Sequence, residues 1–178
     1  MVITIGEVTI EIVEGDIVAQ DGFDAVVNAA NAELMPGGGV AGAIHRAAGP
    51  GLAEECRPLA PIRPGECVIT GGHELPNPHV LHCLGPVYGI DEPAEDLLAS
   101  CYREALRSAD EHGLVSVAFP AISTGAFGYP MHDAADVAAR TVIEAAPGLD
   151  SVRRIRFALF GSEAVGAHVE AFTSNATE

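Results

Sequence analysis

The chain has 178 residues, a hydrophobic share of 48% and a formal net charge of −16, and its nine basic residues are all arginines. An acidic chain repels the phosphate backbone of nucleic acids, so we expect no extended DNA or RNA partner. Without lysine, a Walker A loop, Schiff-base chemistry and a Ser–Lys dyad are excluded. Any bound phosphate must therefore be held by backbone amides.

No apolar stretch approaches the ~20 residues of a membrane span, and the N-terminus MVITIGEVTIEIVEGD lacks the basic start and apolar core of a signal peptide. We therefore expect a soluble, cytoplasmic protein without a membrane partner, forming one domain over residues 1–178. The four cysteines contain no C-x-x-C pair, which favours buried thiols in a reducing compartment over a zinc site or a disulfide framework.

Strands and helices are predicted to alternate along most of the chain. The first two strands alternate polar and apolar residues, whereas the third is almost entirely apolar and is expected at the centre of a parallel sheet. The predicted strands are 2–5, 8–13, 24–28, 66–72, 79–85, 114–119 and 154–160, and the predicted helices are one ending before Gly49-Pro50 and then 50–57, 94–112, 131–146 and 163–172. This order predicts an α/β fold, a three-layer α/β/α sandwich with a mixed, mostly parallel sheet.

Two loops leave a predicted strand and open a helix with glycine, one at 28–42 and one at 120–128. Glycine allows the backbone to approach a ligand closely, and the start of a helix offers unpaired N–H groups to an anion. Parallel strands carry such loops to the same edge of the sheet. The pair of loops therefore predicts one cradle for each phosphate of a diphosphate, although each loop alone would also suit an ordinary turn.

The glycines Gly37, Gly39 and Gly42 also match the dinucleotide fingerprint G-x-G-x-x-G. That fingerprint needs its first glycine at the tip of the strand and a ribose-binding acid about 20 residues further on. Here residues 29–36 intervene, and Glu54 and Glu55 lie in a predicted helix. A nicotinamide-dependent Rossmann enzyme is therefore disfavoured.

Six ordered motifs resemble the ADP-ribose-binding macrodomain family, and most closely its MacroD-type branch: GDIV (15–18), VVNAAN (26–31), GGGVAGAIHRAAG (37–49), GPVY (85–88), CYREAL (101–106) and FPAISTGAFGYP (119–130). The resemblance covers nearly the whole chain. It implies a six-stranded mixed sheet between helices. It also implies ADP-ribose or a mono-ADP-ribosylated protein as the partner, with no cofactor and no metal.

The resemblance also implies roles for individual residues. Asp16 would accept a hydrogen bond from the adenine amino group and the Ile17 amide would donate to the ring, although Asp16 would also suit a turn cap. Phe160 would lie against adenine, unless it is a core residue. Asn31 would bind the distal ribose, unless it only forms an Asx turn. His45 would lie near the reacting ribose, unless it is a packing residue. The two phosphate loops would consist of Gly37, Gly38, Gly39 and Val40, and of Ser123, Thr124, Gly125, Ala126 and Phe127, with Phe127 over the distal ribose.

One departure from the family pattern concerns catalysis. MacroD-type enzymes usually read GGGVDG, whereas this chain reads GGGVAG with Ala41 in place of the aspartate. The leading hypothesis is a metal-independent hydrolase that removes mono-ADP-ribose from acidic side chains or deacetylates O-acetyl-ADP-ribose, with Asn31 and His45 as the catalytic residues. The alternative is a module that binds ADP-ribose without turnover, which Ala41 favours.

Overall fold

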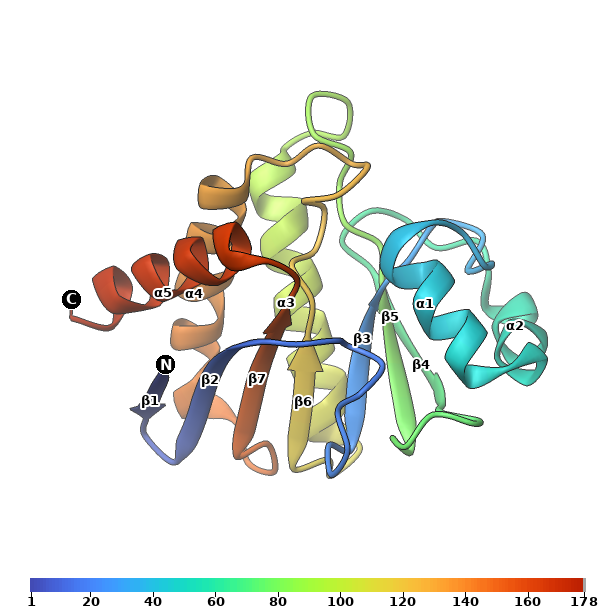
Figure 1. The fold of residues 1–178 in the computed structure, drawn as a ribbon, viewed down its shortest axis with the longest axis horizontal. Coiled ribbons are helices and arrows are strands. Elements are labelled where there is room, and N and C mark those ends of the chain that lie inside the picture. Colours follow the sequence, from blue (N-terminus) through green and yellow to red (C-terminus); the bar gives the residue numbers. More distant parts are fainter. Residues whose placement is uncertain (178) are drawn as a thin grey trace.

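The computed structural model describes residues 1–177, which fold around one seven-stranded sheet (Figure 1). Five central strands run parallel to one another, and the strand at each edge is antiparallel to its neighbour. In spatial order the strands are β1 (Val2–Ile5), β2 (Val8–Glu14), β7 (Arg154–Leu159), β6 (Ser116–Phe119), β3 (Ala25–Ala29), β5 (His79–Cys83) and β4 (Cys67–Gly71).

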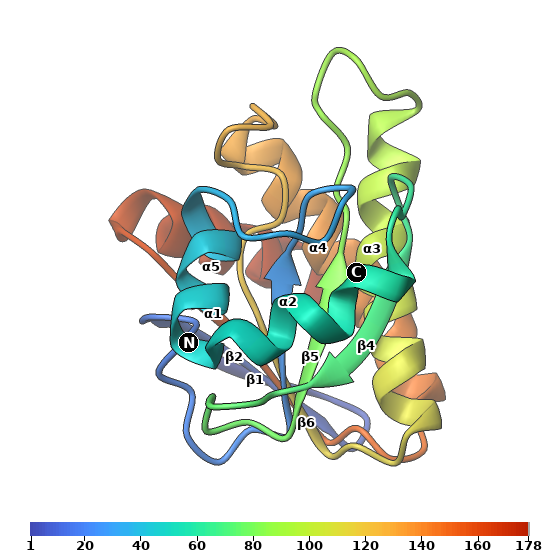
Figure 2. The ribbon, with the colours of Figure 1, turned by 90° about the vertical axis from the view of Figure 1, so that its right-hand side faces the viewer.

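Helices cover both faces of this sheet, which confirms the predicted three-layer arrangement. One layer holds α1 (Gly39–Ala48) and α2 (Pro50–Cys56), and the other holds α3 (Ala94–Glu111), α4 (Met131–Ala145) and α5 (Ser162–Ala176). Figure 2 shows α1 and α3 on opposite sides of β3 and β5. Within the described residues, no helix is both long and apolar enough to cross a bilayer.

The six strands expected from the resemblance are corrected to seven. Seven strands are also what the residue pattern predicted, and the first of them, at 2–5, is present as β1, where Val2 to Ile5 pair antiparallel with Glu11 to Val8 of β2. This pairing satisfies backbone groups of β2 that would otherwise form an open edge. The remaining boundaries differ from the predicted ones by a few residues, with the largest extension in α5, which continues to Ala176.

The central position of β3 follows from its composition. Its residues Ala25, Val26 and Val27 have no exposed surface, and they pack alternately into the cores on the two sides of the sheet. Strands that are covered on both faces are expected to be apolar throughout rather than alternating. The fourth residue, Asn28, is the exception and belongs to a buried polar cluster.

This buried polar cluster is centred on His82 of β5. The Asn28 side-chain amide lies 3.0 Å from His82 Nδ1, and Thr70 Oγ1 lies 2.9 Å from His82 Nε2. The sulfur of Cys56 lies 3.7 Å from the same Nε2. Burial, together with a smaller effect of nearby His45, lowers the pKa of His82 to about 3. His82 is therefore neutral in the folded protein at pH 7.

Folding stability should depend on pH through His82. An unfolded histidine has a pKa of about 6.5, so between pH ~6.5 and ~3 the unfolded chain binds a proton that the folded chain does not. The contribution of neutral His82 to the free energy of unfolding is complete above this window. It decreases on acidification, by up to about 1.4 kcal/mol per pH unit. We expect His82→Gln to reduce the slope of unfolding free energy against pH, measured by urea titration between pH 7 and 5. Replacement of the exposed His132 by Gln is the control, and an unchanged slope in His82→Gln would contradict the assignment.

Candidate functional site

The candidate site is a groove along the carboxyl ends of the parallel strands, formed by two adjoining cavities. We call them the Asp16 cavity, of about 390 Å³, and the Asn31 cavity, of about 290 Å³. Both are lined by Gly39, Val40, Ala121 and Gly125, so they are continuous with each other. Carboxyl ends of parallel strands are where open α/β sheets bind ligands.

Most of the predicted site residues line this groove. The Asp16 cavity contains Asp16, Ile17, Thr124 and Phe160; the Asn31 cavity contains Asn31, Gly38, Ser123, Ala126 and Phe127; and Gly39, Val40 and Gly125 line both. Two predicted residues, Gly37 and His45, line neither cavity. Gly37 instead closes its loop against α1, where a Cβ on Gly42 would lie only 2.2 Å from the Gly37 carbonyl oxygen.

The first glycine loop leads from β3 into α1 and is braced by Asn31. Its side-chain amide donates to the Met35 carbonyl at 2.7 Å, and its side-chain oxygen accepts from the Met35 amide at 3.0 Å. These bonds join residues four apart rather than two, so they are not an Asx turn, and the same side chain lines the Asn31 cavity. No side chain caps the start of α1, so its first backbone N–H groups remain available to an anion in the groove.

The second loop follows β6 and holds Ser123 in a left-handed conformation with φ of +67°. Such a conformation costs a non-glycine residue free energy and is often found at functional sites. Ser123 is 6% exposed, and its hydroxyl has no hydrogen-bond partner within residues 1–177. A Cβ on neighbouring Gly85 would lie 2.1 Å from this hydroxyl oxygen. Glycine at position 85 is therefore required by the close approach of the second loop.

The far end of the Asp16 cavity presents an exposed aromatic ring. Phe160 immediately follows β7 and is 89% exposed. The alternative interpretation of Phe160 as a core residue is therefore wrong. An aromatic side chain of this exposure beside a cavity is suited to stack on a flat apolar ligand.

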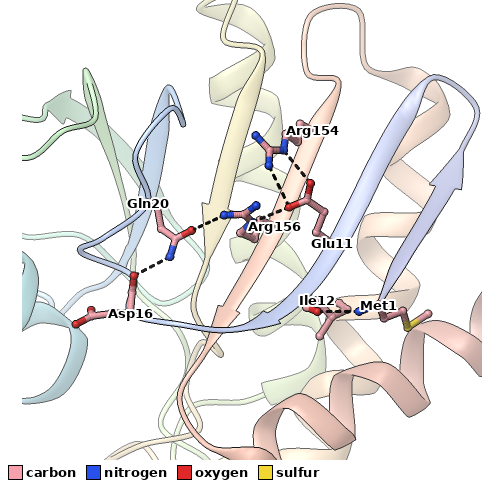
Figure 3. Close-up of polar contacts among 7 residues, drawn as sticks. All are labelled: Met1, Glu11, Ile12, Asp16, Gln20, Arg154 and Arg156. Atoms are coloured by element: carbon pink, nitrogen blue, oxygen red, sulfur yellow. Dashed lines mark hydrogen bonds and ion pairs between the residues drawn. The ribbon is translucent and has the colours of Figure 1, made fainter.

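Asp16 lies opposite, in the turn that follows β2. One of its carboxylate oxygens accepts from the Val18 amide at 3.1 Å, as expected for a turn cap. Figure 3 shows how this turn is held: Gln20 donates to the Asp16 carbonyl at 2.7 Å and accepts from Arg156 at 3.1 Å. Arg156 in turn pairs with Glu11 at 2.6 Å. The position of Asp16 therefore depends on strands β2 and β7.

Glu11 is shared by two arginines on the face of the sheet that α1 and α2 leave open (Figure 3). Both guanidinium groups lie over the ring of Phe23, at 4.5 Å for Arg154 and 4.7 Å for Arg156. Burial alone would raise the pKa of Glu11, but the hydrogen bonds and charges of the two arginines lower it below its ordinary value. Glu11 is therefore held ionised, and it is linked to the Asp16 turn through Arg156 and Gln20.

His45 is buried behind the groove on the inner face of α1. Neither of its ring nitrogens has a hydrogen-bond partner within the described residues, and burial lowers its pKa. Its ring centre lies 6.5 Å from that of His82. The structure does not bring His45 to the cavity wall, so its catalytic role stays a prediction.

The groove holds almost no ionisable groups. The lining of the Asn31 cavity contains no Asp, Glu, His, Cys, Tyr, Lys or Arg side chain, and Asp16 is the one such residue lining the other cavity. Ala41 lines the Asn31 cavity at the start of α1. Over residues 1–177, no group of three His, Cys, Asp or Glu side chains is arranged to hold a metal ion. An anion in this groove would be bound by backbone dipoles and hydroxyls.

Several lining residues were absent from the predicted site. They are small or apolar and include Gly15, Ala43, Gly85, Ala121 and Met131. Gly85 lies in the GPVY motif, and its position after β5 could have indicated it as part of the same edge. Gly15, Ala43 and Ala121 also lie in quoted motifs, but their side chains carry no chemical signal, because an alanine in a cavity wall looks the same as an alanine in the core.

Comparison with known proteins agrees with this architecture. The family model described as Macro domain matches residues 27–138. A macro domain-containing protein of Streptomyces coelicolor is 49% identical over 164 residues, which cover 89% of this chain and 95% of that protein. Another, from Methanosarcina mazei, is 53% identical over 136 residues, covering 76% of this chain and 72% of that protein.

Solved structures agree over the whole chain. The Oceanobacillus iheyensis macrodomain with ADP superposes with a TM-score of 0.95 at 37% identity, covering 99% of this chain and 96% of that one. A Trypanosoma brucei macrodomain in complex with ADP-ribose gives a TM-score of 0.84 at 37% identity, covering 90% of this chain and 68% of that one. From its sequence, its sheet order and its groove, this chain belongs to the macrodomain family.

Proposed function

We propose that the groove binds ADP-ribose and that the protein releases mono-ADP-ribose from acidic side chains, with O-acetyl-ADP-ribose as a second ester substrate. One observation carries the proposal: two adjoining cavities meet at two glycine-containing loops, with no basic side chain in the lining. Such a groove suits an elongated ligand with a diphosphate at its centre. The similar structures with ADP and ADP-ribose support this ligand.

In this proposal, each part of ADP-ribose would contact a different part of the groove. Adenine would stack on Phe160, with its amino group on Asp16 and a ring nitrogen on the Ile17 amide. The diphosphate would lie between the two loops, against Gly38, Gly39 and Val40 on one side and the segment from Ser123 to Phe127 on the other. The distal ribose would then enter the Asn31 cavity, bounded by Asn31 and Phe127.

Hydrolysis in the Asn31 cavity has to rely on positioning. Since no titratable side chain lines this cavity, we assign the activation of water to a diphosphate oxygen of the substrate, which the loops would hold close to the ester. Water then supplies oxygen to one fragment and hydrogen to the other, giving free ADP-ribose and a carboxylic acid. Asn31 would hold the distal ribose in the reactive orientation. His45 remains the alternative base, acting from behind α1.

A second candidate function is binding without turnover. The observation that favours it is the alanine at position 41, which leaves the start of α1 without a carboxylate beside the cavity. The four cysteines, all free thiols, are compatible with either function in the cytoplasm.

Ligand binding should depend on Phe160. We expect calorimetry to show ADP-ribose binding at micromolar strength, about −8 kcal/mol. Phe160→Ala should weaken binding by about 1–3 kcal/mol through lost stacking, without loss of folding because the ring is exposed. Val115→Ala removes another exposed apolar side chain and is the control. Normal binding by Phe160→Ala would place adenine elsewhere.

Turnover should be seen with a protein that carries mono-ADP-ribose on glutamate, incubated with wild type and assayed for free ADP-ribose. Gly38→Glu should abolish release, because it adds a negative charge and a bulky side chain to the diphosphate site. A Cβ at Gly38 would meet nothing within 4 Å, so folding should be retained. Gly166→Glu, at another uncrowded position, is the matched control. Tight binding of ADP-ribose without any release over hours would establish the binding module instead.

The identity of the base can be decided by two variants. If a substrate phosphate activates the water, Ala41→Asp should raise the rate of release, since a positioned general base typically contributes ~10²–10⁴-fold. Binding should weaken slightly, because the new charge lies beside the diphosphate. His45→Ala should then leave most of the rate. If instead His45→Ala abolishes release while the variant still binds ADP-ribose, His45 is the base and the assignment to phosphate is wrong.

A further inference from the structure

A third cavity of about 500 Å³ lies beside the groove and has a different character. It is formed by the loop between β5 and α3, the start of α3, Tyr129 in the loop before α4, and α4 from Asp133 to Arg140. Figure 1 shows the loop between β5 and α3 rising above the sheet at the same edge as the groove. Its lining combines two aromatic rings with four carboxylates and one arginine: Tyr88, Glu92, Glu95, Tyr129, Asp133, Asp136 and Arg140. We call it the acidic pocket.

The acidic pocket and the Asn31 cavity share their dividing wall. The backbone amide of Tyr88 donates to the Phe127 carbonyl at 2.8 Å, and that of Tyr129 donates to the Ser123 carbonyl at 2.9 Å. Phe127 and Ser123 line the Asn31 cavity, whereas Tyr88 and Tyr129 line the acidic pocket. A protein segment attached to a ligand in the Asn31 cavity would therefore emerge from that cavity close to the acidic pocket.

The charges of the pocket are not balanced. Arg140 is already neutralised by Glu95 and Asp136, each at 2.8 Å. Glu92 accepts only a 3.3 Å hydrogen bond from the Ala94 amide. Asp133 has neither an ion pair nor a side-chain hydrogen bond within residues 1–177. Two carboxylates thus remain to receive a positive charge.

The aromatic rings point to the same class of ligand. Tyr129 is 6% exposed and lines the pocket, and its hydroxyl has no hydrogen-bond partner in the described part of the chain. Burial, and then the charges of Glu95 and Asp133 among others, raise its pKa. Tyr88 is 47% exposed, with its ring centre 4.8 Å from that of Tyr129. An aromatic face beside carboxylates attracts organic cations.

We propose that the acidic pocket binds an arginine side chain of the protein segment that carries the ADP-ribose. This inference rests on the proposed function. A guanidinium group can stack on a tyrosine ring and pair with a carboxylate through several N–H donors, which an ammonium group does less well. A metal ion is disfavoured, because no three suitable side chains come together among residues 1–177. The net charge of −16 also favours positively charged partners.

The test uses two fluorescent peptides that carry ADP-ribose through a hydrolysis-resistant linkage and differ only in two flanking residues, arginine or its neutral isostere citrulline. Fluorescence anisotropy measures Kd for each. We expect wild type to bind the arginine peptide about 10-fold more tightly. The double variant Glu92→Gln, Asp133→Asn should bring the two Kd values within about twofold of each other. Titration with free ADP-ribose should give the same Kd for wild type and this variant.

A control variant removes two exposed carboxylates on segments that do not line the pocket, Glu54→Gln on α2 with Glu74→Gln between β4 and β5, and should keep the preference for arginine. Equal affinity of wild type for both peptides would overturn the proposal. A preference for arginine that survives in the Glu92→Gln, Asp133→Asn variant would also overturn it. So would a preference that the control variant loses to the same extent, because either result would assign the preference to overall charge. If free ADP-ribose does not bind to wild type, the proposed function itself fails, and this outcome is distinct from the others.

Discussion

The parallel pairing of β3 with β5 on one side and β6 on the other is the constraint on which the site depends. It brings the carboxyl ends of three strands together, and each of them continues into a segment of the groove wall. Asn31 follows β3, Gly85 follows β5 and Ser123 follows β6. These segments are far apart in sequence, so the groove exists only when the sheet is formed. Any change that weakens the buried β3 should therefore affect ligand binding as well as stability.

Electrostatics then limit how the groove can hold an anion. The protein has a net charge of −16 and no lysine, and none of its nine arginines lines either cavity. Backbone N–H groups at the start of α1 and in the second loop are the available donors. They are fixed in direction by the fold, which favours selection of a ligand by shape. A positively charged flanking segment in the acidic pocket would offset part of the repulsion between a diphosphate and this acidic surface.

The lack of ionisable side chains in the groove also limits how catalysis could occur. Histidines are present near the site, but His45 and His82 are buried behind α1, where burial lowers the pKa of each. The Asn31 cavity is lined by small residues, backbone and the unpartnered hydroxyl of Ser123. The proposed turnover in such a cavity would have to come from holding the substrate and a water molecule in the right geometry. This is why binding and hydrolysis need separate measurements in this protein.

Sequence alone determined the succession of strands and helices, because apolar periodicity and the Gly and Pro positions act locally. It also determined the two glycine loops and the absence of a lysine ligand for phosphate, whereas the fold decided that none of the nine arginines lines the groove. The tertiary structure decided whatever depends on contacts between distant segments. Phe160 and His45 were each ambiguous from local sequence, and the fold exposes the first and buries the second. The requirement for glycine at position 85 and the acidic pocket arise in the same way, because each is defined by neighbours tens of residues away.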